Sequence, residues 1–597
     1  MEYKTREEVP NEYKWDLSKM YENDSEIEKD IEKVKDLTKQ ILKFESHILD
    51  SSSSLYDFLK LTEKQDRVIN KLYVYSKMNL DVDTKNNKNK ALKMKIEKLS
   101  ESLNEQYSFI EPEMMNIDYE IVKNYIKEND KLNEYKFYLE DFYRYKHHSL
   151  SQIEEDIYAK AMNAFGNCSE VFTNINNADI DLGYIKDEEG KDVKLTSSNY
   201  IVYMKSKNRD VRKNAFEAMY NYYKSLKNTL AASYVGEIKE NSFCTNVKKY
   251  NSTIERSLFN DNIDINVYKS LIDTIHKNMN LIYDYMGLRK KILKLDKLHM
   301  YDIYVDLVEA SNDKIPFEKG KEILFKALKP LGKEYLNDLN KAFDEKWIDI
   351  YPREGKRSGA YSWGCYDSYP YLLLNYNDTV DAVSTMGHEL GHSMHSYYSH
   401  ENQPYVDSNY PIFLAEIAST VNEVLINDYL YKNAKTKEEK IFYLIDFLET
   451  VRTTIYRQTM FAEFEMIMHE KEQNGVSLTE EELSNTYYDL NKLYFGDNVV
   501  SDDLIRYEWS RIPHFYTPFY VYKYATGLSA ALSIASRILE GDEDTKEKYL
   551  EFLSSGGNNY PLEILKKVDV DMTTSKPLEE ALSMFEDKLN KVKELIK

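Results

Sequence analysis

The chain has 597 residues, and its 42% hydrophobic and 30% charged side chains are the balance of a folded protein rather than a disordered one. Only 18 glycines and 12 prolines occur, which favours long helices and argues against collagen-like, low-complexity and many-stranded β architectures. With 80 basic and 102 acidic side chains, the formal net charge is −22, and so acidic a surface disfavours nucleic acid and anionic membranes as partners.

The start of the chain shows no signal for export. Its opening sequence, MEYKTREEVPNEYKWDL, lacks the apolar stretch of a signal peptide, and no run of about 18 apolar residues occurs that could span a bilayer. Cys168, Cys244 and Cys365 lie far apart in the sequence, which indicates neither a disulfide framework nor a cysteine-ligated metal. We therefore expect a cytoplasmic protein that does not associate with a membrane.

The N-terminal part of the chain is predicted to be helical. Apolar residues recur at spacings of three and four in 59–72 and in 91–103, which is the period of an amphipathic helix. The same period returns later in the chain, most clearly in 209–226. The fold class expected from these patterns is mostly α.

One stretch, 182–195, interrupts the helical period and predicts a β-hairpin. Its sequence, LGYIKDEEGKDVKL, places short β-type runs on either side of a Glu-Gly-Lys turn. We place a domain boundary at its end. The expected division is an N-terminal helical domain, 1–195, that ends in this hairpin, and a second, catalytic domain, 196–597.

A small sheet is predicted in the middle of the chain. MYDIYVDLV, at 300–308, alternates in the manner of a strand, and 360–363 and 369–376 are predicted to form two more strands. An edge strand placed just before a helix could pair with an extended peptide, or the sheet could simply cover the core. From 381 onward the pattern is helical almost to the end.

The first candidate for a chemically active site is the sequence His388-Glu389-Leu390-Gly391-His392, an HExxH motif. Residues four apart on a helix lie on one face, so His388 and His392 could both bind a single zinc ion. Glu389 would then point at a zinc-bound water and act as a general base. The alternative is that these side chains are an ordinary polar face of a helix.

A catalytic zinc site of this kind needs a third protein ligand, and two candidates follow the motif. His395 shares the helix face, but its Cα would lie about 10.5 Å along the axis from that of His388, a long reach for one metal. Glu416, in FLAEIASTVNEVLIND, is the better candidate because a second helix could deliver it. Glu423, on the same face as Glu416, could support a metal ligand from behind.

A third element, IPHFYTPFYVYKYATG, places His514 among several tyrosines. Water attack on an amide creates an oxyanion, and histidine and tyrosine side chains can stabilise it by donating hydrogen bonds. Tyr520 and Tyr524 are four residues apart, so one helical face could present both. The alternative is a cluster of aromatic side chains that only packs.

Taken together, HELGHSMHSYYS, AEIASTVNE and IPHFYTPFYVYKYATG resemble the oligoendopeptidase F branch of the thimet-oligopeptidase-like zinc metallopeptidases. VPNEYKWDLSKMYEN, GKRSGAYSWG and GGNNYPLEILKKVDVDM are similar to that family as well, so the likeness runs from residue 5 to residue 575. Metzincins are excluded, since Tyr398 stands where their third histidine would be.

The resemblance implies a mostly α fold, a large two-lobed helical peptidase with a deep central channel and a small β-sheet near the zinc-binding helix. It implies hydrolysis of internal peptide bonds in short oligopeptides, with folded proteins excluded and the GKRSGAYS stretch pairing with substrate. It also implies one Zn²⁺ ion per chain, held by His388, His392 and Glu416. Glu389 would be the general base. The side chains that donate hydrogen bonds to the oxyanion and the substrate would be those of His514, Tyr520 and Tyr524.

Two other functions remain open at this point. The long gap between His392 and Glu416 also occurs in relatives that cleave at the carboxyl end, so the chain could be a carboxypeptidase or a peptidyl-dipeptidase. A catalytically inactive peptide-binding protein would use the same channel. Neither spacing nor composition predicts a cleavage-site preference or an oligomeric state.

Overall fold

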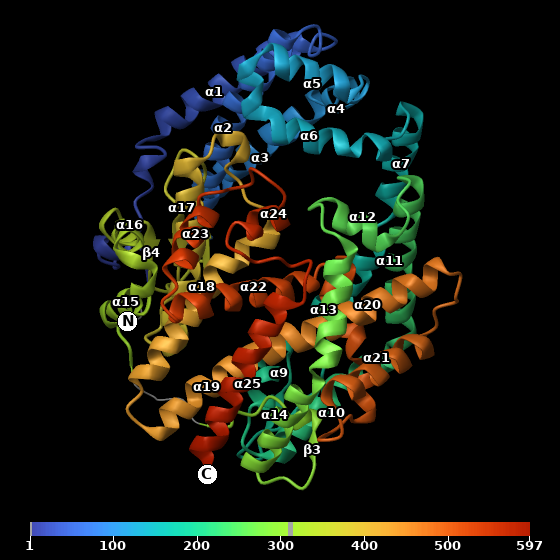
Figure 1. The fold of residues 1–597 in the computed structure, drawn as a ribbon, viewed down its shortest axis with the longest axis vertical. Helices are drawn as coiled ribbons and strands as arrows, with labels where there is room; N and C mark the ends of the chain where they lie inside the picture. The colour runs from blue at the N-terminus through green and yellow to red at the C-terminus, as the bar shows by residue number, and fades with distance from the viewer. Residues whose placement is uncertain (1–2, 309–313) are drawn as a thin grey trace. The chain divides into compact units, whose positions relative to one another are not determined.

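Helices dominate the computed structural model, which describes residues 3–308 and 314–597 (Figure 1). Within these residues the strands are short and form small sheets of two or three strands, so the prediction of a mostly α fold is confirmed. No helix among the described residues has both the length and the apolar character needed to cross a membrane.

The chain divides into two compact units, and each contains segments that lie far apart in the sequence. The first comprises Met1–Ser149, Asn312–Tyr429 and Ile534–Val570, and the second comprises Leu150–Ser311, Leu430–Ser533 and Asp571–Lys597. The contiguous division into 1–195 and 196–597 is a different description of the chain and stays a prediction.

The first unit is built from helices and one three-stranded sheet. Its elements are α1 Asp24–Ile41, α2 Ser52–Val82, α3 Asn87–Gln106, α4 Ile110–Met115, α5 Tyr119–Glu128, α6 Lys136–Arg144, α15 Phe317–Ala327, α16 Gly332–Asp344, β4 Ile348–Asp349, β5 Tyr361–Trp363, β6 Tyr371–Leu373, α17 Val380–Asn402, α23 Glu543–Leu553 and α24 Pro561–Lys566, together with most of α18 Ile412–Asn433.

The second unit is also mainly helical. Its elements are α7 Gln152–Ala164, α8 Asn167–Thr173, β1 Tyr184–Lys186, β2 Asp192–Lys194, α9 Ser197–Met204, α10 Arg209–Ser225, α11 Lys227–Val247, α12 Thr253–Phe259, α13 Ile265–Lys277, α14 Met279–Ile292, β3 Leu298–His299, α19 Lys437–Val451, α20 Arg457–Gln473, α21 Glu480–Phe495, β7 Val499–Val500 and α25 Lys576–Ile596, together with most of α22 Tyr522–Leu539.

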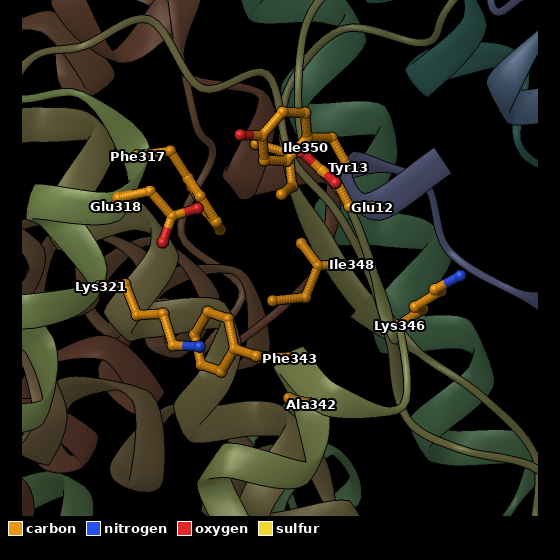
Figure 2. A pocket seen from close by; sticks show the side chains of 10 residues that line it. All are labelled: Glu12, Tyr13, Phe317, Glu318, Lys321, Ala342, Phe343, Lys346, Ile348 and Ile350. Carbon is orange, nitrogen blue, oxygen red and sulfur yellow. The ribbon is translucent and has the colours of Figure 1, made fainter. Parts of the chain in front are cut away.

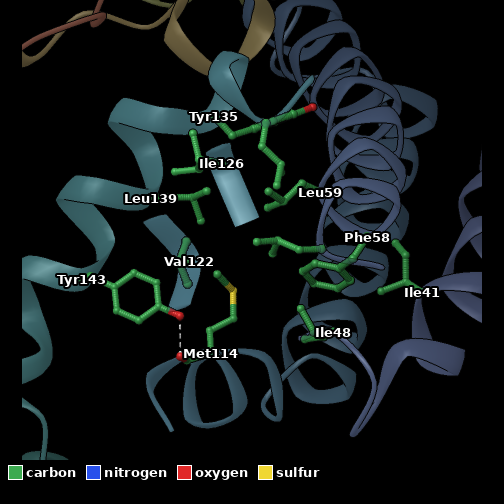
Figure 3. Packing of buried hydrophobic residues seen from close by; sticks show 12 residues of the cluster. Ile41, Ile48, Phe58, Leu59, Met114, Val122, Ile126, Tyr135, Leu139 and Tyr143 are labelled. Atoms are coloured by element: carbon green, nitrogen blue, oxygen red, sulfur yellow. Dashed lines mark hydrogen bonds between the residues drawn. The ribbon is translucent and has the colours of Figure 1, made fainter. Parts of the chain in front are cut away.

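The N-terminal helices enclose a hydrophobic cluster of their own (Figure 3). Its twelve buried members are Ile41, Ile48, Leu55, Phe58, Leu59, Met114, Val122, Ile126, Leu132, Tyr135, Leu139 and Tyr143. The hydroxyl of Tyr143 donates to the carbonyl of Met114 at 2.6 Å, so a polar group is satisfied inside the cluster. The apolar periods predicted in 59–72 and 91–103 fall within α2 and α3.

The small sheet predicted before the metal-binding motif is present in the first unit. Its strand order is β4-β6-β5, with β4 and β6 parallel and β5 antiparallel to β6. Ser362 of β5 pairs with Leu372 of β6. The N-terminal segment lies along β4, where Ile350 donates to the carbonyl of Tyr13 at 3.1 Å. β5 is therefore the other edge of the sheet.

A cavity of about 140 Å³ opens between this N-terminal segment and α15 and α16 (Figure 2). Figure 2 shows Phe317 and Lys321 of α15 facing Ile348 of β4, with Tyr13 at one end. None of the predicted site residues lines this cavity. The predicted site residues therefore lie elsewhere in the fold.

The predicted hairpin is confirmed, but the strand predicted at 300–308 is wrong. β1 and β2 pair antiparallel around the predicted turn. The short strand Leu298–His299 ends just before the predicted one, and a helical turn follows it at Met300–Asp302. The buried carboxylate of Asp302 causes this turn, because it accepts hydrogen bonds from the backbone of His299 at 3.0 Å and from Arg212 at 2.7 Å.

Candidate metal centre

Two helices of the first unit, α17 and α18, carry the predicted metal ligands. Thr379 begins α17 by accepting a hydrogen bond from the backbone of Ala382. Met386, Leu390 and Met394 are fully buried along one side of the helix, so the helix predicted here has the apolar side that its period requires. Burial of this side fixes the direction in which the polar face of α17 points.

Glycines in and beside the HExxH motif let the two helices approach closely. A Cβ atom on Gly391 would lie 2.5 Å from Cα of Ser419 in α18, and one on Gly387 would lie 2.1 Å from Cδ1 of Ile426. Cβ atoms do not approach other atoms so closely. At Gly391 the neighbouring atom belongs to the backbone, so a larger residue there would push the helices apart, whereas at Gly387 the Ile426 side chain would have to move. The close crossing is what brings Glu416 of α18 to the histidines of α17.

Three potential ligand atoms converge where the helices cross. Nε2 of His388 lies 3.2 Å from Nε2 of His392. Oε2 of Glu416 lies 3.5 Å from the first of these nitrogens and 3.6 Å from the second. The structure therefore brings together the three residues that the resemblance assigns as ligands.

These separations fit one tetrahedral zinc ion. Ligand bonds of about 2.0–2.2 Å at tetrahedral angles put ligand atoms about 3.4 Å apart, close to the spacing observed here. The donor set of two imidazoles and one carboxylate is also that of a catalytic zinc site, which keeps one position for water. The Glu416 side chain is 47% exposed, so one side of the group is open.

Glu423 lies behind the first histidine. Its Oε1 lies 2.9 Å from Nδ1 of His388, the ring nitrogen that does not face the other ligands. Burial lowers the pKa of His388, but the hydrogen bond and charge of Glu423 outweigh burial and raise the pKa overall. An acceptor at Nδ1 fixes the tautomer that leaves Nε2 free for a metal.

Glu389 is almost fully buried beside these ligands. Burial raises the pKa of its carboxyl to about 7, while His388 lowers it and Glu416 raises it further. A carboxyl with a pKa near neutrality can both accept and release a proton under ordinary conditions. The side chain has the character that a general base needs.

His395 lies away from the ligand group. Its ring stacks on that of Tyr410, with centroids 3.6 Å apart, and packs against Phe552. It is fully buried, and neither ring nitrogen has a hydrogen-bond partner among residues 3–308 and 314–597. Of the two candidates for a third ligand, the fold brings Glu416 to the histidines and places His395 in an aromatic environment.

The edge strand β5 is attached directly to the motif helix. The hydroxyl of Ser362 lies 2.7 Å from that of Ser393, and Ser393 donates to the carbonyl of Glu389 at 3.1 Å. At the start of the strand, the hydroxyl of Tyr361 donates to the buried carboxylate of Asp81 at 3.1 Å. These contacts fix the edge strand beside Glu389.

His514, Tyr520 and Tyr524 form a separate group in the second unit. The ring centroids of Tyr520 and Tyr524 lie 5.4 Å apart. The ring centroid of His514 lies 6.3 Å from that of Tyr520 and 5.8 Å from that of Tyr524. The hydroxyl of Tyr524 lies 3.3 Å from Nε2 of His514. Burial lowers the pKa of His514, which favours its neutral form.

The prediction that one helical face presents both tyrosines is wrong. α22 begins at Tyr522, so Tyr524 is helical and Tyr520 lies in the loop before it. The reason is a backbone turn at Phe519, whose φ of 54° cannot continue a helix. The two rings meet through this loop and not through helical spacing.

Sequence analysis missed the contacts that hold these groups in place. Gly391 was part of the motif, and a glycine in a helix interior is a signal for close packing. Glu465, which hydrogen-bonds the loop before Tyr520, gave no signal, because a single glutamate in a helix is usually exposed.

Comparison with known proteins gives consistent matches along the chain. A model described as peptidase family M3 matches residues 202–584, and a model described as oligopeptidase F matches residues 113–181. Oligopeptidase PepF of Bacillus subtilis is 42% identical over 591 residues, which cover 99% of this chain and 88% of the relative. The plasmid oligoendopeptidase F of Lactococcus lactis subsp. cremoris is 39% identical over 597 residues, 99% of each chain.

Solved structures are similar as well. A protein from Chlamydophila abortus has 38% identity and a TM-score of 0.95, over 99% of this chain and 100% of its own. The oligoendopeptidase-F of Enterococcus faecium has 34% identity and a TM-score of 0.74, over 96% of this chain and 99% of its own.

Proposed function

The chain belongs to peptidase family M3, and from this premise we propose that it is a zinc-dependent endopeptidase that hydrolyses internal peptide bonds of short oligopeptides. The observation that carries the proposal is the triangle of ligand atoms on α17 and α18, with sides of 3.2, 3.5 and 3.6 Å. His388, His392 and Glu416 would hold one zinc ion per chain.

When bound, zinc supplies Lewis acidity, which activates a water and polarises the scissile carbonyl. Glu389 accepts the proton of the attacking water and then passes it to the leaving amine. Its buried position favours this role, because a pKa near 7 lets the carboxyl act in both directions.

His514, Tyr520 and Tyr524 are proposed to donate hydrogen bonds to the oxyanion and to the substrate. The contact between Tyr524 and Nε2 of His514 supports this assignment, since it couples two donors in one group. The neutral form of His514 keeps an N–H available for an oxyanion.

The substrate is proposed to be a short peptide that adds to β5 as an extended strand. An edge strand offers unpaired backbone groups, and side-chain contacts hold this one beside Glu389. Backbone pairing recognises any extended peptide, which suits a peptidase of broad sequence range. We propose a cytoplasmic location, and the acidic charge of the chain disfavours nucleic acid and anionic membranes as partners.

Mass spectrometry of peptide digests tests this function. The zinc-loaded protein is incubated with peptides of known sequence, with free ends and with blocked ends, beside Glu389→Gln. Internal cuts in the blocked peptides, absent in Glu389→Gln at equal zinc content, are the expected result. Cuts that require a free carboxyl end would replace the proposal with an exopeptidase, and binding without cutting would replace it with a peptide-binding protein.

Metal analysis separates the ligands from the base. His388→Ala and His392→Ala are expected to lose zinc, whereas Glu389→Gln is expected to retain it. A Glu416→Ala protein that kept full zinc would overturn the assignment of the third ligand. The measurement is elemental analysis after dialysis against buffer without metal.

A further inference from the structure

The loop that carries Tyr520 contains an unfavourable backbone conformation. Phe519 has a φ of 54°, in the left-handed region that bulky residues rarely adopt. Its ring is buried, and its centroid lies 5.8 Å from that of Tyr268 and 4.8 Å from that of His469. A conformation of this kind persists only where surrounding contacts enforce it, and such residues concentrate at functional sites.

One enforcing contact comes from Glu465 on α20. Its Oε1 accepts a hydrogen bond from the backbone N–H of Phe519 at 2.7 Å. The side chain is fully buried, and Oε2 has no hydrogen-bond partner in the described part of the chain. Burial holds the pKa of this carboxyl well above its usual range, although the hydrogen bond from Phe519 lowers it. Glu465 therefore acts as a buried acceptor for the backbone of the loop.

Other contacts fix the loop on either side of Phe519. The hydroxyl of Ser257 donates to the carbonyl of Pro518 at 2.8 Å. On the far side, Nζ of Lys523 pairs with the carboxylate of Asp261 at 2.6 Å. The backbone from Pro518 to Lys523 is thus anchored by side chains of separate segments, with Glu465 at its centre.

Packing alone gives no reason for a carboxyl group at this position. A buried carboxyl that makes a single hydrogen bond lowers stability compared with an apolar side chain of similar size. Its hydrogen bond is directed at the residue next to Tyr520, whose ring packs against those of Tyr524 and His514. The carboxyl group of Glu465 therefore stabilises the loop and not the core.

We propose that Glu465 is a positioning residue, which holds the backbone N–H of Phe519 and thereby places Tyr520 beside His514 and Tyr524. The inference rests on the proposed function, in which these side chains donate to the oxyanion. A donor displaced by about 1 Å can reduce turnover by about a hundredfold. The oxyanion forms only after water attack, so a displaced oxyanion donor should lower kcat much more than it changes KM.

Three variants of zinc-loaded protein separate positioning from general stability. Glu465→Met keeps the shape but removes the acceptor, and we expect kcat to fall at least about tenfold with KM within about twofold. Glu465→Gln keeps a side-chain oxygen that can accept from Phe519 and should retain at least half of kcat. Glu463→Met is the matched control, because Glu463 is a buried glutamate of the same helix that pairs with His276 and Tyr494 and not with the loop.

A double-mutant cycle with Tyr520→Phe tests whether Glu465 acts through Tyr520. If it does, Glu465→Met costs much less in the Tyr520→Phe background than in the wild type. An equal and measurable loss of kcat in both backgrounds would overturn the proposal. Should Glu465→Met fail to fold, Glu465→Leu is measured in the same cycle.

A spectroscopic measurement keeps this inference separate from the proposed function. Tyr520 is replaced with 3-fluorotyrosine, and its ¹⁹F resonance is compared among the Glu465 and Glu463 variants. Glu465→Met is expected to shift or broaden the resonance, and Glu465→Gln and Glu463→Met are not. An unchanged resonance in Glu465→Met overturns positioning at any level of activity. A changed resonance with unchanged kcat upholds positioning and removes Tyr520 from the proposed chemistry.

Discussion

The carboxylate of Glu423 and the imidazole of His388 are joined at 2.9 Å, on the side of the ring that faces away from the other ligands. Both residues lie on helices whose crossing is fixed by Gly391, so the contact follows from the same packing that assembles the ligand group. It holds the imidazole in one orientation and one tautomer, which is what a metal ligand requires.

Removing Glu423 should weaken metal binding without abolishing it. Glu423→Leu is expected to lower zinc affinity by about 10- to 100-fold, since it frees the His388 ring and lowers its basicity. Glu423→Gln should lose less, because an amide oxygen still accepts from Nδ1. The measurement is competition with a zinc chelator, with Glu401→Gln as control, an exposed glutamate near the end of α17, the helix that carries His388. Equal affinity in all three variants would contradict the role.

Gly391→Ala should disrupt the ligand group through the backbone. The added methyl would lie 2.5 Å from Cα of Ser419, which belongs to rigid helix backbone and cannot move aside. We expect a loss of about 1–3 kcal/mol in stability and a marked loss of bound zinc. Gly527→Ala is the control, because no heavy atom lies within 4 Å of its Cβ position. Full zinc content in Gly391→Ala would show that the close crossing is dispensable.

Local sequence patterns predicted the parts of the site that depend on local structure. The helix that bears His388 and His392 follows from its own period, and the place of Glu416 on a separate helix after the motif made it the better of two candidates for the third ligand. The hairpin and β5 were also predictable, because turn residues and alternation lie within a few positions. What these features share is that neighbours in the sequence determine them.

Contacts between distant segments account for what the sequence did not predict. The alternation around Asp302 predicted a strand, but Arg212, from a separate helix, stabilises a turn there instead. Spacing placed Tyr520 on a helix, but a hydrogen bond from Phe519 to Glu465 accompanies the turn that excludes it. Nothing in the sequence around either residue reveals its distant partner.

Tyr524→Phe should slow turnover without affecting the metal. The substitution removes a hydroxyl that lies 3.3 Å from Nε2 of His514 and leaves the ring in place. Loss of one oxyanion donor costs about 10²–10³ in kcat, with KM changing by a few-fold at most. Tyr494→Phe, which removes a buried hydroxyl bound to Glu463, is the control for stability. A Tyr524→Phe enzyme with the kcat of the wild type would remove this hydroxyl from the mechanism.

His395 should set part of the sensitivity of the fold to acid. Burial lowers the pKa of His395 to about 3, below the ordinary value of 6.5. Between these two pH values, His395 is therefore protonated in the unfolded chain and neutral in the folded chain. Its contribution is therefore fully present above pH 6.5 and declines by about 1.4 kcal/mol per pH unit as the pH falls toward 3. His395→Phe keeps the stack on Tyr410 and has no group to protonate. Between pH 6.5 and 5.0 we expect the wild type to lose about 2 kcal/mol more than this variant in urea unfolding, at equal zinc content near neutral pH. An identical decline in the two proteins, or a variant without zinc, would contradict the buried, non-ligating position of His395.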